Sequence, residues 1–478
     1  MRNLFYMTWM IGWILGACDG SPSRPAPDAG DDADAVDAAD ATDDLNNANN
    51  LNNVDPPLTV EVLGEYVHPF NEGPRTFRLL KLSRRDGGSA YAMWTRVDTF
   101  SPSPAVLLAQ PYDGIDWTQD PVDTRWADRS RQEPASSYPD EDGPDYIAGV
   151  SANIAYSLST LSALAESSNY YIIHGISPLL VFGRFYAGDD IAGTVNVLHA
   201  GLRFLEAQVD VDPQRVGIIG GSWGGFMSIY GAAYAPASLR VTCAAYFPPV
   251  DFGDMIDYVT VQMPQLAPEA NAGVFSAFFE PYVRRIFAGR GKLGGSAGSW
   301  DGFSTADVCA GLRGDTLVLH DDWDTLVPFS QSTDLVAACP GVDALTWTHD
   351  TPVDWETTSL THGPMSAEPV FPSMTSLATG YLISRLVPVG ATRWYAWSRP
   401  AMTAYLARIR ELEGRGESIS PVAARLLEWL SPTSYVADFA ADPLTIIPAD
   451  EALADLLSEV WEETILPADV ATWLTLRL

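Results

Sequence analysis

The chain contains 478 residues and carries a formal net charge of −33 at pH 7, with 61 acidic against 28 basic side chains. This length predicts one large domain with insertions, or two domains, and a hydrophobic fraction of 47% is enough for a sizeable core. The acidic balance and the lack of a basic stripe in the sequence exclude nucleic acid as an expected partner.

The N-terminus has the pattern of an export signal over residues 1–18. Arg2 precedes an apolar run from Leu4 to Ala17 that is too short to span a bilayer comfortably. The run ends in Leu15-Gly16-Ala17-Cys18, which resembles a bacterial lipobox. That resemblance implies that Cys18 becomes the lipidated N-terminus and anchors the protein to a membrane of the cell envelope. A plain signal peptide that contains a cysteine remains the alternative.

Residues 19–56 are predicted to form a tether. They consist mainly of Asp, Ala, Asn, Pro and Ser, with almost no large apolar side chain. Such a segment cannot bury enough surface to offset the entropy lost on ordering, and its charges repel one another. We therefore expect a disordered acidic spacer between the anchor and the folded part.

Four short apolar runs open the folded part. Residues 58–63, 76–82 and 90–97 alternate partly between apolar and polar side chains and predict antiparallel strands, with a turn at 84–88. Residues 105–109 are continuously apolar, as in a buried central strand.

From residue 146 onward, helical and strand patterns alternate. Apolar side chains recur at helical spacing over 146–176 and 195–205, and buried strands are predicted over 179–182, 216–219, 241–247, 316–319 and 345–348. The alternation predicts an α/β fold with a mostly parallel sheet. It lapses over residues 251–310, where helix-like segments predict a cap insertion.

The most informative stretch runs from Val216 to Gly225. It combines a short apolar strand, a Gly-x-Ser-x-Gly motif centred on Ser222, and a helix that begins near Phe226. A serine nucleophile requires a turn too tight for flanking side chains, and Gly220 and Gly224 supply that room. The N–H groups at the start of the helix favour a developing negative charge. An ordinary glycine-rich turn with a buried serine is the alternative.

A longer motif around this serine carries a family resemblance. Residues 212–225 read Asp-Pro-x-Arg-Val-Gly-Ile-x-Gly-Gly-Ser-x-Gly-Gly, which resembles the catalytic domain of the prolyl oligopeptidase family and its esterase relatives. The resemblance covers roughly residues 60–390 and is strong at three motifs. It implies an α/β-hydrolase fold, with helices on both faces of the sheet, and Ser222 as the nucleophile.

The same resemblance implies the acid of a catalytic triad. In that family the loop after a late strand reads His-Gly-x-x-Asp-x-x-Val-Pro, and residues 320–328 read His-Asp-Asp-Trp-Asp-Thr-Leu-Val-Pro. The role then falls on Asp324. Asp321 stands where the family has glycine, which puts the backbone shape of the loop in doubt, so Asp321 and Asp322 remain alternative acids. A solvated loop with no catalytic carboxylate is the further alternative.

The predicted base is His362. It follows the last clear strand, precedes a helix expected at about residues 367–386, and completes the chain order Ser, Asp, His of α/β-hydrolases. His349 is the rival, although it lies at the end of the strand with no glycine after it. The remaining histidines of the folded part lie before or away from the expected loop or on a packing face: His68, His174, His199 and His320.

The loop that follows residues 105–109 is expected to complete the oxyanion hole. Its Pro111-Tyr112-Asp113 is similar to the loop of the cocaine esterase and X-Pro dipeptidyl peptidase families, in which a tyrosine hydroxyl replaces one backbone donor. The resemblance implies that Tyr112 acts beside the backbone N–H of Trp223. A tyrosine that merely caps the strand end is the alternative.

Cysteines and the C-terminal segment complete the prediction. Cys309 precedes a predicted strand and Cys339 ends the helix after it, so the two could form a disulfide, whereas Cys243 is predicted to be a buried thiol.

Residues 57–389 are predicted to form the hydrolase domain. Residues 390–478 have a mostly helical pattern and predict a helical C-terminal extension, unlike the jelly-roll or propeller of the families named above.

Taken with the resemblance, these motifs imply a serine hydrolase that cleaves a small ester or peptide substrate through an acyl-enzyme. No metal or cofactor is expected to take part. Two alternatives remain open: a serine peptidase of prolyl oligopeptidase type, and a non-catalytic surface binding protein on a hydrolase scaffold.

Overall fold

The computed structural model describes residues 56–70, 73–111, 161–183, 191–266, 300, 302–348, 374–387, 393–397, 434–438 and 445–448. The predicted signal peptide with Cys18 and nearly all of the predicted tether lie outside these residues. Within the described part of the chain, no helix is both long and apolar enough to cross a membrane.

The centre of the structure is a nine-stranded sheet with the order β1-β2-β3-β5-β4-β6-β7-β8-β9. The pairs β1–β2, β2–β3 and β3–β5 are antiparallel, and the remaining pairs are parallel. The strands are β1 (Val60–Phe70), β2 (Gly73–Ser83), β3 (Ser89–Trp94), β4 (Ser103–Gln110), β5 (Ser177–Phe182), β6 (Val211–Gly221), β7 (Val241–Tyr246), β8 (Thr316–Asp321) and β9 (Val342–Trp347).

Strand composition follows position in this sheet. The internal strands β5 and β8 are buried along their whole length because both faces of the sheet are covered. Each contains a continuous apolar run, Leu179–Phe182 in β5 and Leu317–Leu319 in β8, as such a position requires. The edge strand β1 instead exposes most of its first residues, and Val60, Val62 and Val67 are solvent-exposed. Each strand predicted from the sequence overlaps a strand of this sheet. However, β1 ends seven residues after its predicted end at residue 63, and β6 begins five residues before its predicted start at residue 216. The other ends differ by no more than three residues.

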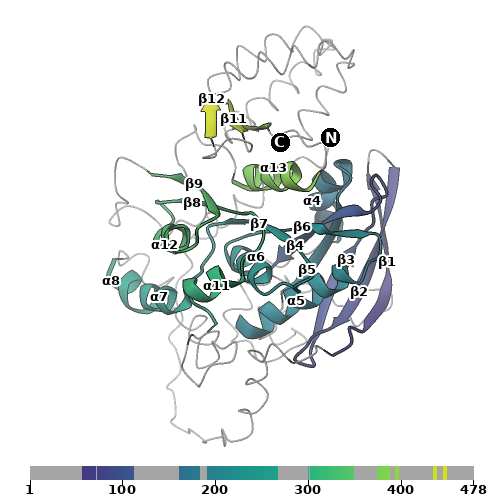
Figure 1. Ribbon diagram of the computed structural model, residues 1–478, viewed down its shortest axis with the longest axis horizontal. Coiled ribbons are helices and arrows are strands. Elements are labelled where there is room, and N and C mark those ends of the chain that lie inside the picture. Colours follow the sequence, from purple (N-terminus) through teal and green to yellow (C-terminus); the bar gives the residue numbers. More distant parts are fainter. Residues whose placement is uncertain are drawn as a thin grey trace, which may run out of the picture.

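Helices cover both faces of the sheet (Figure 1). One face packs in a single apolar cluster with α5 (Ile191–Glu206), α6 (Trp223–Ala233), α7 (Phe252–Asp257), α11 (Thr305–Gly311) and α12 (Ser330–Ala338). The opposite face packs with α4 (Leu161–Ile173) and α13 (Met374–Leu386). This layered, mostly parallel sheet has the α/β-hydrolase architecture, so the fold predicted from the sequence is confirmed.

Most of the described residues of the predicted cap insertion are helical. After α7 the chain continues as a π-helical turn, η2 (Tyr258–Gln262), and then as α8 (Met263–Leu266). Residues 267–299 lie outside the described part, and the insertion returns to the core through α11. A π-helical turn inside a helical segment frequently marks a functional site.

The C-terminal segment contains a small sheet that the predicted helical extension did not include. The strands β10 (Arg393–Trp397), β11 (Ser434–Asp438) and β12 (Thr445–Pro448) pair antiparallel in that order. They are rich in aromatic and β-branched residues, which favour strands, but each is too short to show a clear period of two. The segments whose spacing predicted helices, residues 405–412 and 424–430, lie outside the described residues.

Candidate active site

Ser222 occupies a sharp turn between the end of β6 and the start of α6. Its backbone has φ 55° and ψ −125°, a conformation that residues other than glycine rarely adopt. Two backbone hydrogen bonds hold the turn: the Ser222 N–H donates to the carbonyl of Tyr246 at 3.0 Å, and the Phe226 N–H donates to the carbonyl of Ser222 at 2.9 Å. Backbone strain of this kind costs about 1–3 kcal/mol and persists where the surroundings enforce it, most often at functional sites.

Steric contacts explain the glycines around Ser222. A Cβ atom on Gly220 would lie 2.3 Å from the carbonyl oxygen of Gly224, and one on Gly221 would lie 1.9 Å from the Tyr246 ring. A Cβ atom on Gly224 would lie 2.9 Å from the carbonyl oxygen of Ala109. The turn therefore needs glycine at these positions because neighbouring backbone and a buried ring fill the space.

The serine lies at the carboxyl edge of the sheet, where β6 runs between β4 and β7. Trp223, the first residue of α6, is 8% exposed and packs its ring 4.8 Å from that of Phe226 and 6.1 Å from that of Phe252. Its amide belongs to the first turn of α6, where the helix itself supplies no acceptor. The expected backbone oxyanion donor is thus adjacent to the serine, and the cap insertion, through Phe252, packs on the same tryptophan.

Asp324 lies in the loop after β8, two strands away from Ser222. Its side chain is fully buried. One carboxylate oxygen, Oδ1, accepts hydrogen bonds from the backbone N–H groups of Leu326 and Val327, both at 2.9 Å. These two bonds fix the orientation of the carboxylate, as the acid of a triad requires.

Asp321, one of the two alternative acids, differs from Asp324 in its hydrogen bonds. Asp321 is the last residue of β8, and its Oδ1 accepts the backbone N–H of Trp323 at 2.9 Å, which closes a local turn. Among the described residues other than glycine, only Ser222 and Phe247 have a positive φ. The aspartate that stands in place of the family's glycine therefore sits on an ordinary backbone, and the loop needs no glycine there.

Two predicted site residues, Tyr112 and His362, lie outside the described residues, as does the rival base His349. The described chain includes Pro111, the residue before Tyr112. A Cβ atom on Gly224 would lie 3.7 Å from Cδ of Pro111. The helix that follows the His362 loop begins at Met374.

Tyr246 is a positioning residue that the sequence did not reveal. Its carbonyl accepts the Ser222 N–H, its ring fills the space beside Gly221, and its hydroxyl bonds to Thr375 in the first turn of α13. Burial raises the pKa of Tyr246, and the bond to Thr375 offsets part of that rise. The residue therefore connects the serine turn to the helix after the His362 loop, and nothing in its local sequence signals this.

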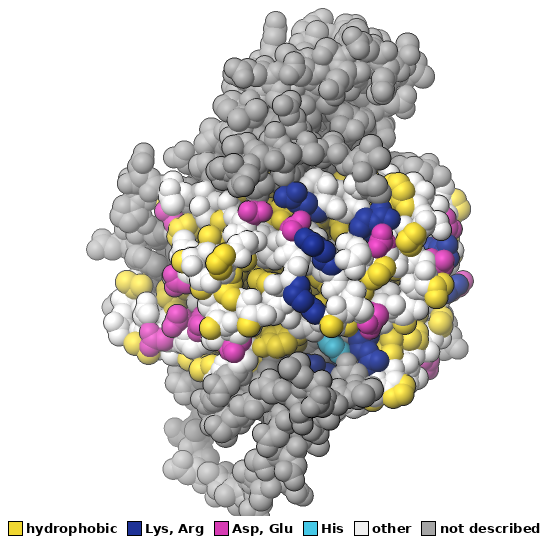
Figure 2. Space-filling model, in the orientation of Figure 1, with side chains coloured by type: hydrophobic (Ala, Val, Ile, Leu, Met, Phe, Trp, Pro, Cys, Tyr) yellow, Lys and Arg dark blue, Asp and Glu magenta, His cyan; other side chains and the backbone are white. Residues whose placement is uncertain are grey.

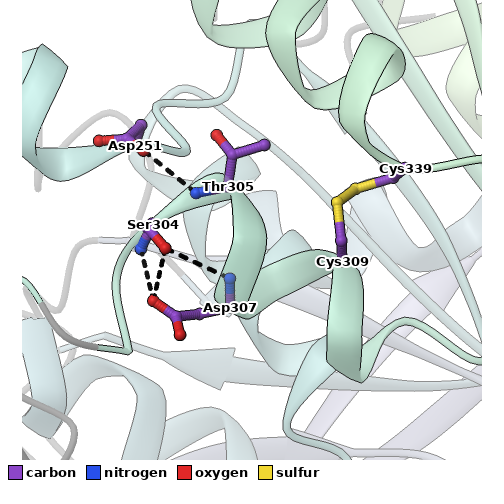
Figure 3. Close-up of a disulfide and its surroundings, with 6 residues drawn as sticks. All are labelled: Asp251, Ser304, Thr305, Asp307, Cys309 and Cys339. Atoms are coloured by element: carbon purple, nitrogen blue, oxygen red, sulfur yellow. Dashed lines mark hydrogen bonds between the residues drawn. A yellow bond between two sulfur atoms is a disulfide. The ribbon is translucent and has the colours of Figure 1, made fainter.

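The ends of the cap insertion are held together at its base (Figure 3). The Asp251 carboxylate accepts the N–H of Asp254 in α7 and that of Thr305 in α11, both at 3.2 Å. Ser304 and Asp307 form a reciprocal capping box at the start of α11. The insertion thus leaves and re-enters the core at one point.

A disulfide joins the insertion to the end of α12, the helix after the loop that contains Asp324. Cys309 of α11 and Cys339, which ends α12, are bonded with a Cα–Cα distance of 5.2 Å (Figure 3). Cys243 is a buried free thiol in β7, and burial raises its pKa. The pairing that was left open in the sequence is the one present in the structure.

In the described part of the chain, no group of three or more His, Cys, Asp or Glu side chains is placed to hold a metal ion. On the face drawn in Figure 2, basic and acidic side chains lie interspersed. Ion pairs among the described residues include Arg240 with Asp315 at 3.1 Å and Arg215 with Asp212 at 2.7 Å.

Comparisons with known proteins give limited likeness. No family model matches the chain, and no curated protein matches it. Solved structures that resemble it include acetyl xylan esterase 1 from Thermoanaerobacterium sp. JW/SL YS485 (15% identity, 70% of this chain, 89% of the other, TM-score 0.39). The acetyl xylan esterase of Paenibacillus sp. R4 is also similar (14% identity, 64% of this chain, 85% of the other, TM-score 0.37). So is dipeptidyl peptidase 4 of Porphyromonas gingivalis (16% identity, 58% of this chain, 32% of the other, TM-score 0.33). Values of this size do not establish a shared activity.

Proposed function

We propose that the protein is a serine hydrolase that cleaves a carboxylic ester or a peptide bond through an acyl-enzyme on Ser222. The observation that carries the proposal is the backbone of Ser222, with φ 55° and ψ −125° at a strand-to-helix turn. A strained turn that presents a serine at the carboxyl edge of such a sheet is the arrangement of a nucleophile elbow. A buried structural serine gains nothing from this strain.

The proposed chemistry uses three side chains in turn. Ser222 attacks the carbonyl carbon of the substrate while His362 takes its proton, and His362 then returns that proton to the leaving group. Water next attacks the acyl-enzyme, with His362 again acting as base, and releases the acid and Ser222. Asp324 holds the imidazole in the correct tautomer and stabilises its charged form.

Two donors are assigned to the oxyanion of the tetrahedral intermediate. They are the backbone N–H of Trp223 and the hydroxyl of Tyr112. One such donor contributes about 3 kcal/mol to transition-state stabilisation. The position of Trp223 at the first residue of α6 supports the first assignment, and the resemblance of the Pro-Tyr-Asp loop supports the second.

The test measures ester and anilide hydrolysis by the full chain. The substrates are p-nitrophenyl acetate, p-nitrophenyl butyrate and an X-Pro-p-nitroanilide, and the variants are Ser222→Ala and the control Ser167→Ala in α4. Ester turnover that Ser222→Ala abolishes and Ser167→Ala retains supports the hydrolase and favours an esterase. Anilide turnover moves the assignment to a peptidase. If no substrate turns over and a fluorophosphonate does not label Ser222, the protein is instead a binding protein on this scaffold.

We further propose that the enzyme is anchored to a membrane of the cell envelope by lipid on Cys18. The lipobox-like Leu15-Gly16-Ala17-Cys18 and the acidic segment after it support this location. In bacterial cells expressing the full chain, the wild type should fractionate with membranes and carry a lipid detectable by mass spectrometry. Cys18→Ser should lose both properties. Release of the wild type as soluble, unmodified protein would show a plain signal peptide instead.

A further inference from the structure

His320 is a fully buried histidine outside the proposed triad, in β8 just before the acid loop. Its Nδ1 lies 2.7 Å from Oγ of Ser332, and its Nε2 lies 3.1 Å from the carbonyl oxygen of Val327. The ring also packs edge-on against Phe329, with 5.6 Å between centroids. The imidazole is therefore held in one orientation by the loop in front of α12 and by the first turn of that helix.

The partners of the ring assign its proton. A carbonyl oxygen can only accept a hydrogen bond, so Nε2 carries the hydrogen and donates it to Val327. In the neutral imidazole Nδ1 is then an acceptor, and the Ser332 hydroxyl donates to it. The Val327 carbonyl thus selects the Nε2–H tautomer, and the fully buried Ser332 holds the other side of the ring by donating to Nδ1.

Val327 connects His320 to the proposed acid. Its carbonyl accepts from His320, and its own N–H donates to Oδ1 of Asp324 at 2.9 Å. The direct distance from His320 Nε2 to Asp324 Oδ2 is 3.8 Å, which is too long for a hydrogen bond. His320 consequently acts on the carboxylate through the backbone of Val327, whose carbonyl it binds and whose N–H holds the carboxylate, and not by a direct hydrogen bond.

We propose that His320, held in place by Ser332, is a positioning residue for Asp324. This inference rests on the function proposed above, in which Asp324 orients His362. A misplacement of about 1 Å in a catalytic constellation can cost on the order of a hundredfold in rate. His320 and Ser332 therefore support the rate of catalysis, because they fix the direction of the Val327 N–H that holds the Asp324 carboxylate.

Two pairs of variants separate this role from packing. Ser332→Ala removes the hydroxyl, whereas Ser332→Thr keeps it. His320→Gln retains an N–H near the position of Nε2 that can reach the Val327 carbonyl, whereas His320→Asn is too short to do so. Thr333→Ala is the matched control, because Thr333 is exposed on the same turn of α12 and bonds only locally to the carbonyl of Ser330.

The experiment measures kcat, KM and the pH dependence of kcat/KM for p-nitrophenyl butyrate in the full chain. Titration with a fluorophosphonate counts the active sites, so that kcat refers to folded protein only. We expect Ser332→Ala and His320→Asn to lower kcat by about tenfold to a hundredfold with little change in KM. The acidic limb of the pH profile should shift to lower pH, because a less well aligned carboxylate stabilises the imidazolium of His362 less. Ser332→Thr and His320→Gln should restore most of the rate, and Thr333→Ala should match the wild type.

Each result decides between the readings. Wild-type kcat and an unshifted pH profile in Ser332→Ala, or failure of Ser332→Thr to restore the rate, would overturn the positioning role and leave packing alone. The positioning role would also be overturned if Ser332→Ala had fewer titratable active sites but each remaining site had the wild-type kcat. A wild type that neither hydrolyses the ester nor reacts with the fluorophosphonate is a different result, since it removes the serine-hydrolase function itself.

Discussion

Tyr230 and Gln331 bind the two sides of a single residue, Val250. The Tyr230 hydroxyl donates to the Val250 carbonyl at 2.6 Å, and the Gln331 side-chain oxygen accepts the Val250 N–H at 2.7 Å. Tyr230 belongs to α6, which begins at the proposed nucleophile, and Gln331 belongs to α12, which follows the loop of the proposed acid Asp324. The segment after β7 thus braces the two halves of the site against each other.

Removal of the hydrogen bond between Tyr230 and Val250 should lower the stability of the fold. Tyr230→Phe leaves the buried Val250 carbonyl without its donor, so the free energy of unfolding should fall by about 1–3 kcal/mol in urea denaturation. Tyr234→Phe is the control, because Tyr234 lies in the same stretch of chain but its bond to the Gly302 carbonyl, at 2.9 Å, is only partly buried. Equal losses in the two variants would show that the Val250 contact contributes no more than a partly exposed hydrogen bond.

Substitution of Gly221 should disrupt the serine turn. In Gly221→Ala the new Cβ would lie 1.9 Å from the Tyr246 ring, and the required shift should cost about 1–3 kcal/mol of stability and most of the esterase activity. Gly64→Ala is the matched control, since a Cβ there meets nothing within 4 Å. Thermal denaturation and p-nitrophenyl butyrate turnover measure both effects. Full activity in Gly221→Ala would mean that Tyr246 moves without disturbing Ser222.

The identity of the catalytic acid can be tested by amide substitution. Asp324→Asn keeps the size of the side chain but removes its charge, and kcat should fall on the order of 10⁴-fold, as for the corresponding change in a serine protease triad. Asp322→Asn should leave kcat close to that of the wild type. Steady-state kinetics with titrated active sites give the comparison, and the reverse ranking would transfer the role to Asp322.

The disulfide should stabilise the fold under oxidising conditions. Cys309 and Cys339 are separated by 30 residues, and cross-linking a loop of that length is expected to contribute about 3–4 kcal/mol. The wild type should therefore unfold at lower urea concentration after reduction. The double variant Cys309→Ser/Cys339→Ser should unfold at the same concentration with and without reductant. Unfolding of the wild type that does not respond to verified reduction would show that the bond adds nothing to stability.

Alkaline pH should destabilise the helical layer around α6. Burial, and to a smaller extent the charge of Asp307, raise the pKa of Tyr234 to about 12, while Arg85 lowers it slightly. The unfolded chain releases this proton near pH 10, so the contribution of Tyr234 to stability is complete below pH 10 and is lost as pH rises towards 12. In urea denaturation between pH 9 and 12, the free energy of unfolding should fall less steeply with pH for Tyr234→Phe than for the wild type. If it falls equally steeply in both, the alkaline loss of stability comes from other tyrosines.

The sequence by itself determined the sheet, the glycines of the turn and the candidate nucleophile. These features are local. An apolar run as long as a strand must be buried, and a turn with no room for side chains requires glycine at Gly220 and Gly224, two residues before and after Ser222. The short strand β10 (Arg393–Trp397) escaped prediction because five residues cannot display a clear period, and its pairing partner β11 lies far along the chain.

Only the tertiary structure decided which distant groups meet. The contact of Tyr246 with the serine turn, the two-sided hold of Tyr230 and Gln331 on Val250, and the bond of Ser332 to His320 all join segments whose proximity depends on the assembled sheet. The choice of Cys309 and Cys339 as disulfide partners has the same origin. Spacing along the chain specifies which residues can form a strand or a turn, whereas the packing of helices on the sheet fixes the distances between them.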